Sequence, residues 1–284
     1  MKHNILVIGG TGKTGRRIVN LLTKTGHQVR VGSRQGSPAF DWHHPEGWPA
    51  AIEGMNALYI TYQPDLAVPG ALQAIEELVK VAKRSHVKKL VLLSGKGERE
   101  AQLCEQVVIH SGLDHVIVRA NWFNQNFSEN FLVEGVIEGS VAFPFAEMKI
   151  PVVDADDIDE VAFKALTEDN HKGKIYELTG PEGLTFEEAI QVISDVSGRA
   201  IKFTGVSIGT YVAALKAQEL PEDFIWLIEY LFTEVLGNPS NSEITTDIEE
   251  VLGRKPIRFI EYAEKTVSTG VWNVVVDDSS DHFP

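Results

Sequence analysis

The sequence predicts a doubly wound α/β fold, in which helices cover both faces of a parallel sheet, with a smaller, mostly helical lobe toward the C-terminus. Three observations lead to this prediction. Short apolar runs alternate with stretches of helical periodicity up to about residue 120. Glycines follow the first apolar run and open the first helical stretch. From about residue 207 to 268 the pattern is mostly helical.

The elements follow in order along the first half of the chain. The first apolar run, NILVIG, has the β-branched character of a buried parallel strand. The helical stretch after it places Ile18, Leu21 and Leu22 on one face and ends at Gly26. Further helices are expected at 72–86 and 100–113. We therefore expect six strands, at 4–9, 27–34, 39–42 (AFDW), 56–62, 88–95 and 114–120.

Beyond residue 120 the alternation loosens. KIPVVDADDIDEVAFKALTE predicts a strand followed by a helix, and GKIYELTG with the stretch after it repeats that order. We interpret 1–150 as a nucleotide-binding domain whose sheet is partly completed by 151–180. Residues 151–272 would form the smaller substrate-side lobe, folded onto the carboxyl edge of the sheet, and 273–284 a disordered tail.

Composition excludes several classes of function. A net charge of −14 argues against nucleic acid as a partner. No apolar run has the length of a membrane helix, and the N-terminus does not resemble a signal peptide. The single cysteine, Cys104, fits a reducing cytoplasm and is expected to be a buried apolar residue on a helix. Seven basic and no acidic residues occur in 1–40, which indicates a local site for an anion.

The stretch VIGGTGKTGRR allows two interpretations. A P-loop requires a glycine five residues before Gly12, and that position is Val7, still inside the first strand. The dinucleotide motif fits better, because Gly10, Gly12 and Gly15 match G-x-G-x-x-G between a strand and a helix. Gly12 would let the backbone approach a pyrophosphate, and Gly15 would let the helix lie close to the strand. The expected fold is therefore of the Rossmann type.

The end of the second strand indicates which dinucleotide is bound. An NAD-binding chain places an Asp or Glu there to hold the ribose 2′-hydroxyl, whereas this chain has Ser33 and Arg34. A guanidinium can pair with a 2′-phosphate that a carboxylate would repel. The sequence therefore favours NADP(H), with Lys13 of the glycine loop as a candidate second cation.

With these residues in view, the chain resembles the NmrA-like, atypical short-chain dehydrogenase/reductase family. The resemblance rests on GGTGKTGRR, VGSR, FDW, LVLLSG, SGLDHVIVRANWFNQNF and KIPVVDADDIDEVAFKAL, in the order and spacing of that family. SRQGSPAFDW, LPEDF and FIEYAEKTVSTGVW are similar to its ergot-alkaloid branch of agroclavine and festuclavine dehydrogenases, which reduce an iminium. The similarity extends nearly to Trp272.

The resemblance implies where a cofactor and a substrate would lie. Asp41 and Trp42 would lie beside the adenine, Tyr62 and Gln63 along the adenosine, and Ser94, Gly95 and Lys96 near the nicotinamide. Asn121, Trp122 and Phe123 would line the substrate side; Trp42 and Phe123 could equally be core residues, and Ser94 a strand cap. The cofactor-binding residues expected are Gly9, Gly10, Thr11, Gly12, Lys13, Thr14, Gly15, Ser33, Arg34, Asp41, Trp42, Tyr62, Gln63, Ser94 and Gly95.

The usual proton-relay residues of short-chain dehydrogenases are missing. None of the six tyrosines is followed by a lysine at the fourth position, as Tyr-x-x-x-Lys requires. Hydride addition to an iminium needs no such acid, and a quinone could take protons from solvent or Lys96, a weak catalytic candidate. Trp122, Trp226 and Tyr230 would suit a cationic aromatic substrate, although core packing is the more ordinary explanation for Trp226 and Tyr230.

The DADDID segment is explained better by helix capping than by metal binding, and no metal-ligand spacing is found. We therefore expect a cytoplasmic NADP(H)-dependent reductase of a small aromatic imine-like or quinone-like substrate. A homodimer is compatible with the sequence. The alternative is a non-catalytic NADP sensor that binds a protein partner, which the missing Tyr-x-x-x-Lys supports and the apolar C-terminal lobe opposes.

Overall fold

A parallel sheet organises the first part of the molecule. In the computed structural model, which describes residues 2–274, its six strands lie in the order β2-β1-β3-β4-β5-β7. Every neighbouring pair is parallel, which confirms the predicted fold class. The strands are β1 (Asn4–Ile8), β2 (Gln28–Gly32), β3 (Ala57–Ile60), β4 (Lys89–Gly95), β5 (Asp114–Ala120) and β7 (Lys174–Leu178).

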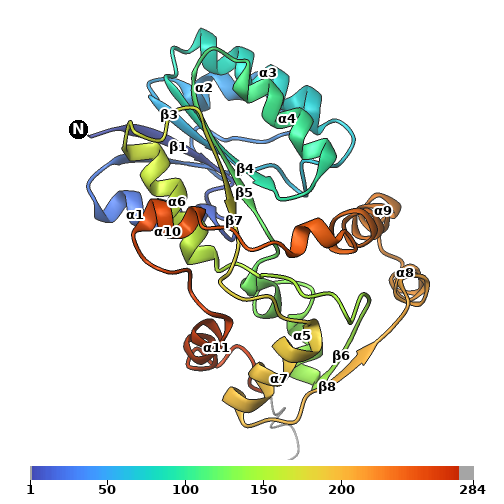
Figure 1. Cartoon of the computed structure of the whole chain (residues 1–284). Coiled ribbons are helices and arrows are strands. Elements are labelled where there is room, and N and C mark those ends of the chain that lie inside the picture. Colours follow the sequence, from blue (N-terminus) through green and yellow to red (C-terminus); the bar gives the residue numbers. More distant parts are fainter. Residues whose placement is uncertain (1, 275–284) are drawn as a thin grey trace, which may run out of the picture.

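Helices cover both faces of this sheet (Figure 1). Side chains alternate along β1, so Leu6 and Ile8 pack with the helices of one face and Ile5 and Val7 with those of the other. The inner strands β1, β3, β4 and β5 are accordingly buried on both sides, which explains their apolar sequence, whereas the edge strands β2 and β7 are partly exposed. The first face carries α2 (Trp48–Ile52), α3 (Ala71–Arg84) and α4 (Arg99–Ile109); the second carries α1 (Gly15–Lys24), α6 (Ala155–Thr167) and α10 (Asp247–Leu252).

Two predicted strands are wrong. The stretch 39–42 is a loop that folds back onto β2, with the Phe40 amide donating to the Ser33 carbonyl at 2.9 Å. Its aromatic side chains, Phe40 and Trp42, pack with Trp48 in the core between the sheet and the helices α2, α3 and α4. Their apolar character therefore reflects packing and not strand pairing. The stretch 149–153 makes only isolated bridges, Ile150 with Leu184 and Phe123 with Val153.

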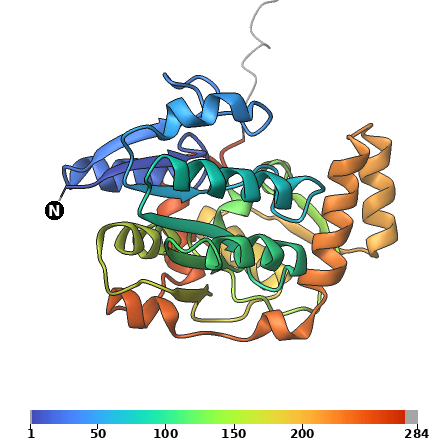
Figure 2. The same cartoon turned by 90° about the horizontal axis from the view of Figure 1, so that it is seen from above.

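The second part of the molecule has its own aromatic core. Phe143 and Phe232 are fully buried in it, with ring centroids 4.9 Å apart. The helices α8 and α9 stand side by side at one end of the molecule (Figure 2). The α-helices of this part are α5 (Val133–Glu138), α7 (Phe186–Ser197), α8 (Ile208–Ala217), α9 (Glu222–Tyr230) and α11 (Phe259–Val267). Its strands are β6 (Ser140–Phe143) and β8 (Lys202–Gly205). It also contains the π-helix η3 (Leu231–Leu236) and the 3₁₀ helices η2 (Asn124–Phe127) and η4 (Pro239–Ser242). A further 3₁₀ turn, η1 (Pro45–Gly47), precedes α2.

The chain passes between the two parts several times. The helix α10 lies within the expected lobe segment 151–272, yet it packs against α6 and β7 of the sheet. The predicted tail lies outside the described residues except for 273 and 274. None of the helices described in the structure is long and apolar enough to span a bilayer.

Candidate dinucleotide site at the carboxyl edge of the sheet

The glycine loop makes a tight turn between β1 and α1. Gly9 has φ +71°, and its amide and that of Gly10 both reach the carbonyl of Gly32, at 2.9 and 3.2 Å. The Gly12 amide then donates back to the Gly9 carbonyl at 2.8 Å. A Cβ on Gly15 would lie 2.1 Å from that same carbonyl oxygen. The structure therefore gives Gly15 the packing role that the motif assigns to it.

The start of α1 is open to an anion. Thr14, the N-cap, makes no side-chain cap, and no acid lies in the first turn of this helix, which the structure describes completely. Its hydroxyl instead accepts from Tyr59 at 3.0 Å. Thr11 and Gly12 are exposed, so the loop before the helix and the positive end of the helix dipole are accessible to solvent there. These features fit a bound pyrophosphate.

The residues expected around the adenosine converge beyond β2 and β3. Arg34 is exposed next to Ser33. The Trp42 indole N–H donates to the Thr61 carbonyl at 3.2 Å, and its ring lies against Tyr62 at a centroid distance of 4.7 Å. Trp42 is half-buried and packs on the core, and its place beside an adenine stays a prediction. Asp41 directs its carbonyl to Trp48 and its carboxylate to the His43 amide, and Gln63 is exposed.

The residues expected near the nicotinamide are held by other contacts. The Ser94 hydroxyl is buried and donates to Glu105 at 2.7 Å, so its side chain faces α4. The Lys96 ammonium is also buried, 3.3 Å from the Ser240 carbonyl and 3.9 Å from Glu177. Above Gly95, the side chain of Glu98 occupies the space that a Cβ would need. The backbone of Gly95 and Lys96, and not their side chains, therefore forms this edge.

The segment after β5 joins the sheet to the aromatic core. The Asn121 amide group donates to the Asn241 carbonyl at 2.9 Å and accepts from the Trp122 amide at 2.7 Å. Trp122 packs against Phe232 at 5.3 Å. Phe123 lies beneath the Lys13 ammonium, 5.4 Å from ring centroid to nitrogen. These side chains thus meet the glycine loop across the edge of the sheet.

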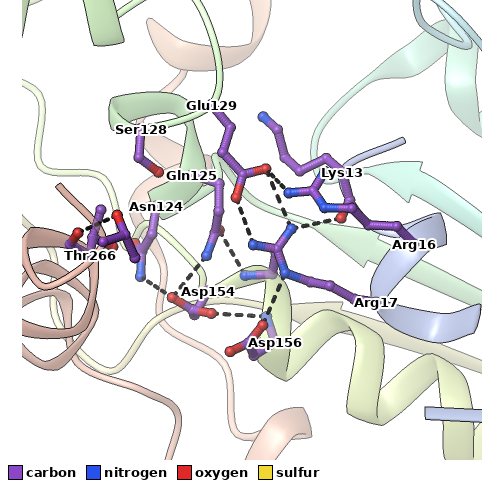
Figure 3. A network of polar contacts seen from close by, with 12 residues as sticks. Lys13, Arg16, Arg17, Asn124, Gln125, Ser128, Glu129, Asp154, Asp156 and Thr266 are labelled. Atoms are coloured by element: carbon purple, nitrogen blue, oxygen red, sulfur yellow. Dashed lines mark hydrogen bonds and ion pairs between the residues drawn. The ribbon is translucent and has the colours of Figure 1, made fainter. Parts of the chain in front are cut away.

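Lys13 does not lie beside Arg34. Its ammonium donates to the Asn126 side-chain oxygen at 2.9 Å, on the opposite side of the glycine loop from the end of β2. Figure 3 shows the polar network at this junction, with Arg16 and Arg17 of α1 meeting Glu129. The idea that Lys13 shares the 2′-phosphate with Arg34 is therefore wrong in this conformation.

Trp226 and Tyr230 lie farther away on α9. Their rings stack at 5.5 Å, and the Tyr230 hydroxyl donates to Glu100. Trp226 is 45% exposed, so the core interpretation of this residue is wrong. Its short helix packs on η3, and the indole remains on the outer face.

Several charged groups near this edge were not predicted. Arg119 pairs with Glu105 at 2.6 Å and with Glu177 at 2.9 Å, a bidentate arrangement that strand spacing alone does not reveal. Burial, and then the Asp65 carboxylate, raise the pKa of the Glu98 carboxyl well above its usual range. Cys104 is buried as expected, and burial raises its pKa to about 12.

The DADDID segment behaves as predicted. Asp154 caps α6 by accepting from the Asp156 amide at 2.9 Å, and Asp156 pairs with Arg17. Among the described residues no group of His, Cys, Asp or Glu is arranged to hold a metal ion.

Comparisons with known proteins show the family and the fold of the chain. Residues 9–169 match the NAD(P)H-binding family. Prestalk A differentiation protein A of Dictyostelium discoideum is 28% identical, covering 94% of this chain and 93% of its own. Festuclavine synthase I of Penicillium roqueforti is 30% identical, with 92% and 97% covered. The NADPH-dependent quinone oxidoreductase QOR2 of Escherichia coli, solved with NADPH, superposes with a TM-score of 0.73 at 19% identity, covering 93% and 99%.

Proposed function

The chain belongs to the NAD(P)H-binding family of oxidoreductases, and on that premise we propose that it is an NADP(H)-dependent reductase of a small aromatic imine-like or quinone-like substrate. The observation that carries the proposal is the uncapped, acid-free start of α1, with Arg34 on one side and an aromatic core on the other. Reduced NADP would supply a hydride at this edge.

Different residues would bind the different parts of the cofactor and surround the substrate. The Gly9, Gly10 and Gly12 amides shape the glycine loop by bonding to carbonyls, so loop amides without such a bond, those of Thr11 and Lys13, would hold the pyrophosphate beside a helix start that has no competing carboxylate. Ser33 and Arg34 would hold the 2′-phosphate, and the faces of Trp42 and Tyr62 would lie along the adenosine. Within the second part, Trp122 and the phenylalanines around it would exclude water from the reacting atoms.

The names of relatives support the substrate class. One relative is named as a festuclavine synthase and one structural neighbour as a quinone oxidoreductase that depends on NADPH. The missing Tyr-x-x-x-Lys fits acceptors that are already electrophilic, such as an iminium carbon or a quinone. Such a substrate needs positioning and a dry site more than a dedicated tyrosine acid.

NADPH oxidation across a panel of cyclic imines and quinones tests the proposal. We expect turnover with NADPH and weaker turnover with NADH. A chain that binds NADP⁺ and NADPH tightly and discriminates between them, yet turns over none of the acceptors, would instead be a sensor. One relative, from Dictyostelium, is named as a differentiation protein, so the same experiment should also test the sensor alternative.

A further inference from the structure

Lys13 begins in the glycine loop and ends on the substrate side. Its ammonium lies 2.9 Å from the Asn126 side-chain oxygen and over the ring of Phe123, both in the segment after β5. Ligands of doubly wound sheets lie outside the carboxyl ends of the strands, between such loops. The Lys13 side chain therefore spans the part of the edge where the reacting end of the cofactor and the substrate would meet.

The charge of Lys13 is not neutralised by a partner. Glu129 is the nearby carboxylate, but its two oxygens are taken by Arg16 and Arg17 of α1. Arg17 is in turn held by Asp156 at 3.0 Å. Among the described residues Lys13 forms no ion pair, and its partners are a neutral amide oxygen and an aromatic face. An ammonium in such a place is available to a new acceptor.

The other candidate acids at this edge are already occupied. Lys96 is directed to Ser240 and Glu177, and the Tyr59 hydroxyl donates to Thr14. The Glu98 carboxyl is folded over Gly95 beside Asp65.

The reduction of a quinone requires a proton donor as well as a hydride donor. Reducing a quinone adds a hydride, which the oxidation of bound reduced cofactor supplies, and leaves a negatively charged oxygen that must be protonated. We propose that Lys13 is the catalytic acid of this reductase, touching the acceptor heteroatom and donating a proton to it. This inference rests on the proposed function. The Nζ–H bond breaks as the O–H bond forms, and the resulting amine regains a proton from water.

The surroundings set the pH range in which this acid works. Burial lowers the pKa of Lys13 to about 8, with Glu129 opposing the change and Arg17 and Arg16 adding to it. A lysine in this range is a far better proton donor at neutral pH than an exposed one. Rates should therefore fall above about pH 8, as the ammonium loses its proton.

The test compares Lys13→Gln and Lys13→Arg with Lys24→Gln, which removes the same charge from the exposed end of α1, the helix that follows the glycine loop. We expect Lys13→Gln to lower kcat for a quinone by about 100-fold, the lower limit for loss of a general acid, while the Kd for NADPH changes less than about threefold. Lys13→Arg keeps the charge but cannot release the proton, so it should also lose kcat. Lys24→Gln should match the unaltered protein.

A second readout needs neither cofactor nor turnover. Reductive methylation with ¹³C-formaldehyde labels lysines for NMR, and Lys13→Gln identifies the Lys13 signal by its absence. We expect that signal to titrate near pH 8.

The outcomes separate the two proposals. An unaltered protein that reduces no acceptor overturns the proposed function and this inference with it. An active protein whose Lys13→Gln variant keeps its kcat, or loses only NADPH affinity, overturns this inference alone, because Lys13 would then be a cofactor ligand. A Lys13 signal that titrates near the ordinary lysine value of 10.5, and not near pH 8, also contradicts it.

Discussion

The helices α1 and α6 lie side by side on one face of the sheet, yet their N-termini are built in opposite ways. The start of α1 follows glycines, has no side-chain cap and carries arginines in its first turns. The start of α6 is capped by Asp154 and carries two further acids in its first turn. Both helices present the same positive dipole end to the same region.

The difference shows how side chains decide the use of a helix start. In α6 the Asp154 carboxylate and the Gln125 side-chain oxygen accept from the first two backbone amides, so no external anion is needed. In α1 no side chain accepts from the first amides; those of Arg16 and Arg17 donate only to the Gly12 and Thr14 carbonyls, so the positive end of the helix has no negative charge from within the chain and can meet an external anion. The two ends also complement each other, since Arg17 of α1 bonds Asp156 of α6 at 3.0 Å.

The largest expected effect comes from adding a side chain at Gly15, the first residue of α1. In Gly15→Ala the new Cβ would overlap the Gly9 carbonyl at 2.1 Å and the Gly10 Cα at 2.7 Å, backbone atoms that cannot rotate away. We expect a loss of roughly 3–5 kcal/mol of stability and about 100-fold weaker NADPH binding, measured by urea unfolding and fluorescence titration. Gly209→Ala in α8, where the space is open, is the control and should be neutral or slightly stabilising. Equal effects of the two variants would refute the packing argument.

Removing the cap of α6 should be the next largest effect. Asp154→Ala removes the bond from the Asp156 amide and those from Asn124 and Gln125, at 3.2 and 3.1 Å, in a buried place. A lost cap and unsatisfied amides should together cost about 2–4 kcal/mol in urea unfolding. Ser207→Ala, which removes the exposed cap of α8, should cost about 1 kcal/mol. NADPH affinity should not change; if it weakens tenfold, α6 also serves the ligand.

Asp159, a buried acid in α6, should make the stability of the protein depend on pH. Within residues 2–274, neither carboxyl oxygen of Asp159 has a hydrogen-bond partner, and burial raises its pKa well above the usual range. The folded protein therefore holds this proton longer than the unfolded chain, and stability falls as pH rises above about 4. Asp159→Asn should gain roughly 1–3 kcal/mol at pH 8 and less at pH 5 in urea unfolding.

Asp169→Asn, at a fully exposed carboxylate 3.8 Å from the Lys89 ammonium, is the control for Asp159→Asn and should change stability by no more than about 1 kcal/mol at either pH. A gain from Asp159→Asn that is the same at both pH values would show that Asp159 is already ionised in the folded protein.

The smallest expected effect concerns Arg34, which lies just beyond the end of β2. Arg34 is exposed and free to meet a 2′-phosphate, so Arg34→Ala should weaken NADPH binding about tenfold, or 1.4 kcal/mol, and leave NADH unchanged. Arg84→Ala removes an exposed arginine at the far end of α3 and should alter neither affinity. An unchanged ratio of the two affinities in Arg34→Ala would assign the 2′-phosphate to another residue.

Local pattern was sufficient for the glycine loop and the order of the elements. Gly15 and the Asp154 cap follow from backbone sterics and helix ends, which depend on residues close in sequence. The same pattern failed at 39–42, where aromatic side chains pack on α2 and the core, because apolar content does not distinguish a packed loop from a strand. It failed again at Trp226, because helical spacing cannot say whether a face has a partner.

The sequence by itself determined that a parallel α/β sheet carries a dinucleotide-type glycine loop at its first strand, since these features are encoded by neighbouring residues. Only the tertiary structure decided where the charged side chains point. Lys13 reaches Asn126 and Lys96 reaches Ser240, partners 113 and 144 residues away in the chain. Such contacts depend on how distant segments pack, and a long side chain can turn toward either side of its loop until that packing is known.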